Sequence, residues 1–276
     1  DDACLEYLKI RRFPDGICCK KCDRITNHHK VVSRKSYSCG VCGHHVHPTA
    51  GTIYHKSSTP LTDWFYAVFL MASTRCGISA KQLERELGVT YKTAWRMFHQ
   101  IRSMLTESDD KLGGDGLMVE VDETYIGARP RYGKTQTGRG AANKTIVAGA
   151  VERKGSVKAK IIPNTKAESL VPFVKETVEQ LSIVHTDEWR PYRQIQNHRF
   201  YHETSNHGRK QWVIGDSHTN SIEGFWSLLK GGLRGVYKGR ATRKYLQNYI
   251  NEYAFRYNRR NDEQPMFISF LNQVSQ

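Results

Sequence analysis

Two aspartates in this sequence each follow an apolar run that has the pattern of a buried strand. Asp122 ends the run Val119-Glu-Val-Asp, and Asp187 ends the run Ile183-Val-His-Thr-Asp. Burying a carboxylate at such a position is costly unless it is paired or bound to a cation. If the two strands are neighbours, both carboxylates project from the same end of one sheet. The alternative is that each aspartate is an ordinary turn residue.

A third acid lies in a segment that a helical repeat divides into two faces. At about 100° per residue, one stripe gathers the apolar side chains, which are Ile222, Phe225, Trp226, Leu229 and Leu233. A separate polar face carries Asn220, Glu223, Ser227 and Lys230. If the apolar stripe packs on the sheet, the polar face can point along it towards the two aspartates.

Three converging oxygen ligands suit two Mg²⁺ or Mn²⁺ ions ~3.5–4 Å apart, an arrangement that holds both oxygens of an in-line phosphodiester displacement. One ion would lower the pKa of the attacking water or 3′-hydroxyl, and the other would stabilise the leaving oxygen. Lys230 would lie beside this site and hold a phosphate. The sequence therefore predicts a catalytic centre of Asp122, Asp187 and Glu223.

A cysteine cluster near the N-terminus has the spacing of a zinc site. Cys19-Lys-Lys-Cys22 and Cys39-Gly-Val-Cys42 are two CxxC knuckles separated by sixteen residues. Each knuckle can place two thiolates ~2.3 Å from one Zn²⁺, and four thiolates leave no open position, which predicts a structural ion. Metal binding would then supply the folding energy of this polar segment. Cys18 can compete with Cys19, and the histidines that can replace a thiolate are His44, His45 and His47.

The elements that would position these residues follow one another in the order of an α/β domain. Strand patterns are expected at 117–122, 145–151, 157–162 and 182–186, and helical patterns at 167–181, 221–233 and 242–258. Pro172 is expected near the first turn of the first of these helices. A polar break at 107–116 indicates a linker. The expected domains are a zinc ribbon over 1–55, a helix-turn-helix domain over 56–110 and a catalytic domain over 115–276.

Residues 78–105 have the pattern of two helices joined by a tight turn. Gly88 suits the left-handed position that ends a helix, and Thr90 suits the next N-cap. The shared core is expected from Leu83, Leu87, Val89, Ala94, Phe98 and Ile101. The residues expected to face out towards base edges and phosphates are Tyr91, Lys92, Thr93 and Arg96. A helical hairpin that only packs is the alternative.

The overall charge indicates a polyanionic partner. Lysine and arginine outnumber aspartate and glutamate by 42 to 27, which gives a net charge of +15, and a hydrophobic content of 38% is typical of a globular protein. A basic loop carries four residues expected to contact a DNA backbone: Arg129, Arg131, Lys134 and Arg139. The longest apolar stretch, 64–72, is too short to cross a bilayer. Clustered cysteines without a secretion signal favour a reducing compartment, so a cytoplasmic protein is expected.

As an ensemble, these motifs resemble those of the Merlin-like bacterial insertion-sequence transposases. The resemblance covers nearly the whole chain. It rests on the paired knuckles and on Thr49-Ala-Gly-Thr, Gly88-Val-Thr-Tyr-Lys-Thr-Ala-Trp-Arg-Met, Val121-Asp-Glu-Thr-Tyr-Ile-Gly, His185-Thr-Asp, His218-Thr-Asn-Ser-Ile-Glu-Gly-Phe-Trp and Asn251-Glu-Tyr-Ala-Phe-Arg-Tyr-Asn-Arg-Arg. It implies an N-terminal zinc ribbon followed by a DDE catalytic domain of the RNase H-like fold, a mixed sheet flanked by helices.

By that resemblance Asp122, Asp187 and Glu223 are the DDE triad, with thirty-five residues between the last two. Parts of the family carry asparagine in place of the third acid, and Asn220 lies one turn earlier on the same helix. A carboxylate binds Mg²⁺ better than an amide, which favours Glu223. The resemblance also implies transposon terminal inverted repeats as the double-stranded DNA substrate, joining of 3′ ends to target DNA, and a homodimer or higher homo-oligomer that brings two ends together on the bacterial nucleoid.

Other interpretations of the sequence compete with this one. Gly127-Ala-Arg-Pro-Arg-Tyr-Gly133-Lys-Thr looks like a phosphate-binding P-loop, but it has five residues between the glycines, contains Pro130 and leads into no helix. Tyrosines recur every four residues at Tyr245, Tyr249 and Tyr253, which indicates helix-face packing more than a nucleophile. A zinc-ribbon and helix-turn-helix regulator, or an RNase H-like nuclease or resolvase, remain the alternative functions.

Overall fold

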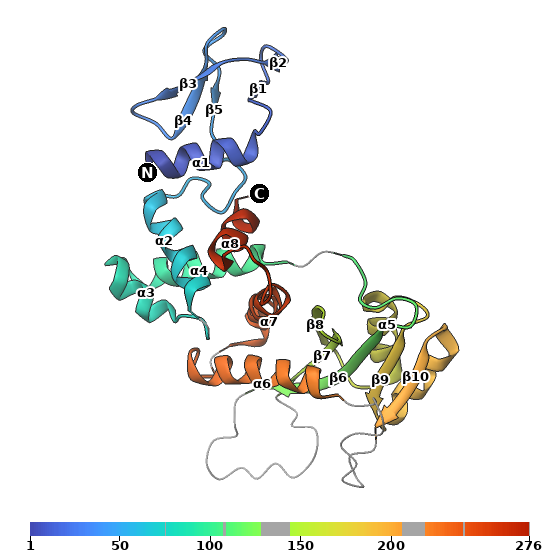
Figure 1. The fold of residues 1–276 in the computed structure, drawn as a ribbon. Helices are drawn as coiled ribbons and strands as arrows, with labels where there is room; N and C mark the ends of the chain where they lie inside the picture. Colours follow the sequence, from blue (N-terminus) through green and yellow to red (C-terminus); the bar gives the residue numbers. More distant parts are fainter. Residues whose placement is uncertain (75, 107–108, 128–143, 206–218, 240, 276) are drawn as a thin grey trace. The chain divides into compact units, whose positions relative to one another are not determined.

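The chain forms two compact units in the computed structural model (Figure 1), which describes residues 1–74, 76–106, 109–127, 144–205, 219–239 and 241–275. Unit 1 comprises Asp1–Leu105 together with Asp262–Gln276, and unit 2 comprises Thr106–Asn261. Within these described ranges, no helix combines the length and the apolar character needed to cross a membrane.

Unit 1 begins with a helix and a small all-antiparallel ribbon. Helix α1 (Asp2–Arg12) precedes two sheets made of β1 (Cys18–Cys19), β2 (Arg24–Ile25), β3 (His28–Val31), β4 (Ser36–Cys39) and β5 (His45–Val46). The sequence analysis did not anticipate α1. Its Leu5 and Leu8 are buried, and Tyr37 of β4 donates a 2.6 Å hydrogen bond to Glu6, so the helix is attached to the ribbon.

The remainder of unit 1 is helical. Its elements are α2 (Leu61–Ser73), α3 (Ala80–Leu87), α4 (Tyr91–Met104) and α8 (Met266–Val274). The predicted turn between α3 and α4 is confirmed: Gly88 has a φ of 65°, and the Thr90 hydroxyl accepts a hydrogen bond from the backbone N–H of Thr93.

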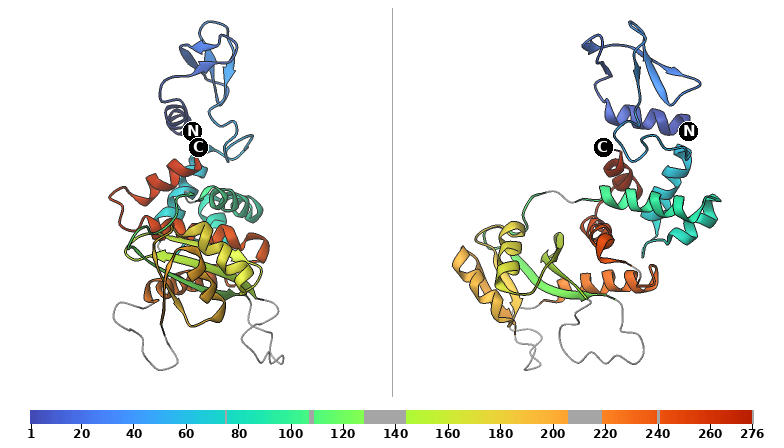
Figure 2. Two further views of the ribbon diagram at one scale, coloured as in Figure 1. Left: turned by 90° about the vertical axis from the view of Figure 1, so that its right-hand side faces the viewer. Right: turned by 180° about the vertical axis from the view of Figure 1, so that it is seen from behind.

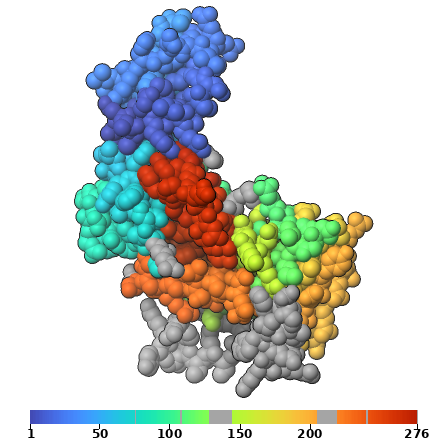
Figure 3. Space-filling view, viewed as in Figure 1, coloured from blue at the N-terminus to red at the C-terminus, as the bar shows by residue number. Residues whose placement is uncertain are grey.

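Helix α8 differs from the expected domain boundary, which placed it in the catalytic domain. It packs against α2 and α4 of unit 1, and Figure 3 shows the red C-terminal residues beside the cyan ones of α2. The T-shaped contact between Phe69 and Phe267, with ring centroids 5.6 Å apart, is part of this packing. The final segment therefore belongs to unit 1, because its apolar face is buried there.

Unit 2 is built on a five-stranded mixed sheet with the order β10-β9-β6-β7-β8. The strands are β6 (Met118–Ile126), β7 (Thr145–Glu152), β8 (Val157–Ile162), β9 (Ile183–Asp187) and β10 (Tyr201–Ser205). The pairs β6–β7 and β7–β8 are antiparallel, whereas β9 is parallel to both β6 and β10. This arrangement is the RNase H-like sheet, and β10 is a strand that the sequence analysis missed.

Helices cover both faces of this sheet (Figures 1 and 2). On one face, α5 (Ala167–Thr177) and the 3₁₀ segment η1 (Arg190–His198) bury Val119 and Val121 of β6. On the other face, α6 (Asn220–Gly235) and α7 (Arg243–Asn258) pack on β7 and β8. Because side chains alternate along a strand, Glu120 and Asp122 of β6 point to the α6 face.

Two predicted boundaries in unit 2 are wrong. Strand β6 continues past Asp122 because residues up to Ile126 keep pairing with β7, so Asp122 lies inside the strand and not at its end. Helix α5 ends at Thr177 because Val178 leaves it to form a parallel bridge with Leu112, and Pro172 lies inside this helix beyond its first turn.

Candidate active site and zinc centre

The three acids singled out in the sequence come together at the α6 face of unit 2. Parallel pairing of β6 with β9 matches Met118 with Ile183 and Glu120 with His185, and the same register continued by two residues brings Asp187 beside Asp122. Glu223 lies in the first turn of α6. Both Asp187 and Glu223 are close enough to raise the pKa of Asp122 by charge repulsion.

Asp122 is the most perturbed member of this group. Burial is the main cause that raises its pKa to about 6, followed by the negative charge of Asp187, while that of Glu223 contributes less. Trp226 of α6 donates a 2.9 Å hydrogen bond from Nε1 to Asp122 Oδ2, which opposes the shift without cancelling it. A partly buried cluster of like charges is stabilised by a bound divalent cation, so these residues fit a metal site.

The spacing of the acids differs from that of the cysteines. Within the described residues, the four sulfur atoms of the ribbon lie within 4.8 Å of one another, and no trio of acidic residues is gathered as closely. Carboxylates that share two ions ~3.5–4 Å apart need not meet around a single point.

Removing the charge of Asp122 is expected to stabilise the protein when no Mg²⁺ or Mn²⁺ is bound. Asp122→Asn relieves the repulsion and keeps an oxygen that can accept the Trp226 hydrogen bond. A pKa raised from 3.8 to about 6 corresponds to about 3 kcal/mol in the free energy of unfolding. Thermal unfolding of the zinc-loaded protein at pH 7, with no added Mg²⁺ or Mn²⁺, should therefore occur several degrees higher in the variant.

The upward shift of the Asp122 pKa predicts the pH range in which the substitution stabilises the protein. Because the folded-state pKa is raised, the charged carboxylate reduces stability progressively between about pH 4 and pH 6, and the stabilisation by Asn should be complete above that range and absent below it. Asp115→Asn, at an exposed position of the same unit, is the control and should leave the unfolding temperature unchanged. A lower unfolding temperature for Asp122→Asn at pH 7 would contradict the electrostatic account.

Two other predicted residues lie on the same helix. Asn220 is the exposed first residue of α6. Lys230 is half-buried; burial lowers its pKa, and the charge of Asp122 opposes that shift, which places the ammonium group near the carboxylate cluster.

Two further acids of β6 were not predicted as site residues. Burial raises the pKa of Glu123 to about 7, and its Oε2 accepts a 2.7 Å hydrogen bond from the hydroxyl of Tyr192, on the opposite face from Glu120. Glu120 is fully buried and binds Arg153 and the start of α6. The sequence carried a signal for Glu120, because this carboxylate lies between Val119 and Val121 in a buried strand. Glu123 stands between Asp122 and Thr124, so its chain neighbours gave no such signal.

The predicted cysteine ligands form one cluster in unit 1. Cys19 Sγ lies 3.5 Å from Cys42 Sγ, and Cys22 Sγ lies 3.9 Å from Cys39 Sγ. Cys18 is exposed and outside the cluster, which also contains none of the alternative ligands His44, His45 and His47. Two paired CxxC turns with converging sulfurs are the donor set of a structural zinc ion.

The hydrogen bonds around Cys39 favour a thiolate at this position. The Thr26 hydroxyl lies 3.1 Å from Cys39 Sγ, and this hydrogen bond, with those from the backbone of Cys42 and Val41, lowers the pKa of the Cys39 thiol to about 5. Hydrogen bonding to neighbouring sulfurs raises the pKa of Cys22, chiefly through Cys42. A thiolate is the form in which cysteine binds zinc.

The proposed recognition face of α4 is largely exposed. Tyr91, Lys92 and Arg96 are exposed, while Thr93 is half-buried with its hydroxyl 3.1 Å from that of Thr90. Of the predicted core, four residues are fully buried and Leu87 and Val89 only partly; the buried ones are Leu83, Ala94, Phe98 and Ile101. The loop residues Arg129, Arg131, Lys134 and Arg139 lie outside the described residues.

Comparison with known families matches both units. Residues 111–258, more than half of the chain, match the ISXO2-like transposase domain, and residues 1–45 match the transposase zinc-ribbon domain. The chain belongs to the ISXO2-like transposase family. The resemblance to insertion-sequence transposases with a zinc ribbon and a DDE domain is therefore confirmed.

Individual relatives agree with this assignment. The transposase is 29% identical over 250 residues to an uncharacterized protein in transposable element ISH50 of Halobacterium salinarum, which covers 84% of this chain and 83% of the relative. It is 30% identical over 114 residues to an uncharacterized transposase-like protein of Haemophilus influenzae, covering 41% and 89%.

Among solved structures, two Mos1 complexes are similar at 11% sequence identity. They are a pre-cleavage transpososome, with a TM-score of 0.26 over 80% of this chain and 82% of that chain, and a strand transfer complex, with a TM-score of 0.25 over 78% and 80%. Scores this low do not establish a shared fold, so the RNase H-like assignment rests on the sheet order and on the family match.

Proposed function

We propose that this transposase cleaves DNA at the terminal inverted repeats of its element and joins the 3′ ends to target DNA, using two divalent ions held by Asp122, Asp187 and Glu223. The observation that supports this most directly is the meeting of these three acids, which have thirty-five or more residues between them in the chain, at one face of the sheet. Their mutual repulsion is the state that bound cations would relieve.

The proposed roles follow from where each side chain lies. Mg²⁺ or Mn²⁺, when bound, supplies activation of the attacking oxygen and stabilisation of the leaving oxygen. Trp226 fixes the orientation of the Asp122 carboxylate through its 2.9 Å hydrogen bond. Lys230 provides a positive charge beside the carboxylates for a DNA phosphate, and Asn220 is the alternative third ligand.

We propose three functional domains: the zinc ribbon over 1–55, the helix-turn-helix domain over 56–110, against which α8 packs, and the catalytic domain over 115–261. The ribbon holds a structural Zn²⁺, the helix-turn-helix domain binds transposon ends, and the catalytic domain cuts and joins DNA. Because two ends must be processed together, a homodimer or higher homo-oligomer on the bacterial nucleoid is the proposed working form.

The direct test uses the chain with labelled DNA carrying the ends of the element that encodes it, target DNA and Mg²⁺. Joined products support the transposase proposal. Cut but unjoined ends indicate the nuclease or resolvase alternative, and bound but uncut DNA indicates the regulator. A denaturing gel resolves the cut and joined products, and a native gel shift detects DNA that is bound but uncut.

Replacement of the exposed cations of α4 is expected to weaken binding of duplex DNA. Lys92→Ala with Arg96→Ala removes two phosphate contacts, so the slope of log K against log salt should fall by about 0.9 per contact. The matched control, Lys154→Ala with Lys166→Ala, removes the same charge from exposed positions of unit 2. Fluorescence anisotropy at several salt concentrations measures both. Equal slopes for the two double variants would exclude α4 as the recognition helix.

A further inference from the structure

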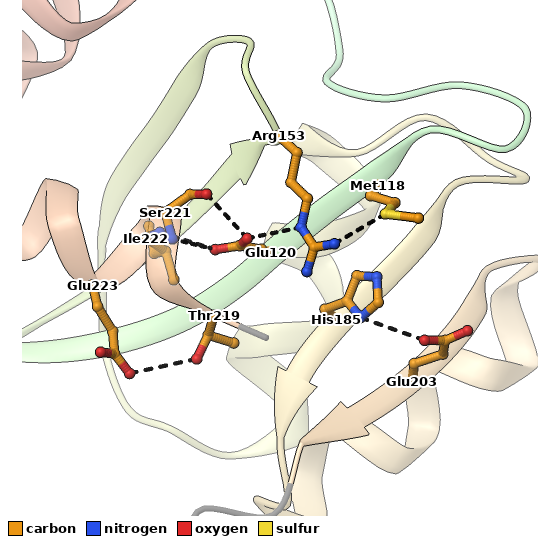
Figure 4. A network of polar contacts seen from close by, with 9 residues as sticks. All are labelled: Met118, Glu120, Arg153, His185, Glu203, Thr219, Ser221, Ile222 and Glu223. Carbon is orange, nitrogen blue, oxygen red and sulfur yellow. Dashed lines mark hydrogen bonds and ion pairs between the residues drawn. The ribbon is translucent and has the colours of Figure 1, made fainter. Parts of the chain in front are cut away.

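Glu120 is a fully buried carboxylate with donors on two sides. On one side, Arg153 Nε donates to its Oε1 at 2.9 Å. On the other, the backbone N–H groups of Ser221 and Ile222 donate to its Oε2 at 2.8 and 3.1 Å, and the Ser221 hydroxyl donates to Oε1 at 3.1 Å. Figure 4 shows the carboxylate between Arg153 and the start of α6.

These contacts make Glu120 the N-terminal cap of α6. The first N–H groups of a helix have no partner within it, and a side chain of the N-cap residue commonly accepts one of them. Here the side chain of the N-cap residue, Thr219, makes no such bond. The acceptor is Glu120 of strand β6, 101 residues before Ser221 in the chain. A negative charge at this end also suits the helix dipole.

Strand β6 therefore holds α6 at two points that flank Glu223. Glu120 accepts the backbone N–H groups of residues 221 and 222. Asp122, which lies two positions further on the same face of the strand, accepts the hydrogen bond from Trp226. The indole is packed closely on the sheet: a Cβ on Gly149, the β7 partner of Asp122, would lie 2.6 Å from the Trp226 ring. Glu223 lies in the single helical turn between these attachments.

We propose that Glu120 is a positioning residue that sets the location of Glu223 relative to Asp122, with Arg153 as its compensating charge. This inference rests on the proposed function, since it assigns Glu223 to the metal site. Glu120 itself is occupied by the helix and by Arg153, so it acts through α6 and not as a ligand. A buried carboxylate needs both partners, because burial without them is strongly unfavourable.

The test is Mn²⁺ binding to the full-length, zinc-loaded protein without DNA, followed by electron paramagnetic resonance. In Glu120→Gln one oxygen can still accept from the helix, but the new –NH₂ group faces the donors Arg153 and Ser221. We expect Mn²⁺ to bind about tenfold more weakly, as for partners that orient metal ligands. Ser221→Ala removes only the hydroxyl contact, so we expect a loss of about twofold to threefold.

The chain offers a matched control in Glu252, on α7. It is also fully buried, its Oε1 accepts from Arg256 at 2.9 Å, and it lies near the Tyr237 hydroxyl, which follows the opposite end of α6. Glu252→Gln should lower the unfolding temperature much as Glu120→Gln does, yet change Mn²⁺ affinity by less than about twofold. If a loss of stability alone weakened metal binding, the Mn²⁺ affinity of both variants would fall equally.

The outcomes separate the positioning role from the proposed function. If Asp187→Asn loses Mn²⁺ binding while Glu120→Gln and Ser221→Ala keep that of the unaltered chain, the positioning role is overturned and the metal site stands. Equal weakening by Glu120→Gln and Glu252→Gln overturns it as well. If Asp187→Asn binds Mn²⁺ as the unaltered chain does, the proposed function fails. Should Glu120→Gln not fold, Ser221→Ala decides.

Discussion

Asp187→Asn is expected to bind transposon-end DNA as tightly as the unaltered transposase while losing at least about three orders of magnitude in cleavage and strand transfer, which corresponds to about 4 kcal/mol of transition-state stabilisation. Asparagine offers the metal ions one neutral oxygen in place of a charged carboxylate. The local structure should survive, because Asp187 Oδ1 accepts the backbone N–H of Trp189 at 3.0 Å and an amide oxygen can accept it equally.

The neighbouring Glu188 provides the control. It is exposed, next in the chain, and carries the same charge, so Glu188→Gln should cleave and join within about twofold of the unaltered rate, as is usual for surface substitutions. Gel-shift affinity and the yield of joined product are measured on the same preparations. An Asp187→Asn protein that still joins ends would refute the catalytic assignment, and the regulator alternative predicts that neither substitution matters.

The sequence predicted the strands of unit 2 where apolar alternation is strong. The expected range 157–162 matches β8 (Val157–Ile162), and the parallel neighbours β6 and β9 bring Asp122 and Asp187 together as expected. Strand β10 escaped because Tyr201-His-Glu-Thr-Ser lacks a clear apolar face, and it pairs with β9 as an edge strand. Strand β8 also lies at an edge of the sheet, but Val157 and Ile162 are buried there, so its apolar pattern was visible in the sequence.

What the sequence could not show was the connection between strand and helix. Glu120 appears in the sequence as a charge among valines, and its function depends on N–H groups of Ser221 and Ile222 that become its neighbours only after folding. The same holds for Trp226, which the helical repeat assigns to the apolar stripe but whose Nε1 also reaches Asp122. The roles of Asp122, Asp187 and Glu223 themselves stay predictions until the variants are assayed.

Removal of zinc is expected to unfold the ribbon of unit 1 without unfolding unit 2. The ribbon strands are two to four residues long, and two of the buried side chains among them are the ligands Cys19 and Cys39, so little other apolar surface stabilises the segment. Structural zinc contributes about 10–16 kcal/mol of apparent binding free energy at neutral pH, which is as large as the whole stability of a typical domain. Cys39→Ser, or a strong chelator, should therefore abolish the protected amides of β3 and β4 in hydrogen exchange.

The variant Cys18→Ser tests whether Cys18 is a zinc ligand. Cys18 is exposed and adjacent to a ligand in the chain, so this variant should retain one zinc per chain by native mass spectrometry and the amide protection of the unaltered protein. Loss of zinc from Cys18→Ser, or a protected ribbon in Cys39→Ser, would contradict the four-thiolate site. Because the acids lie in a different unit from the thiols, Mn²⁺ should still bind to Cys39→Ser; the two metals then have separable tasks, one folding the ribbon and the other serving the chemistry.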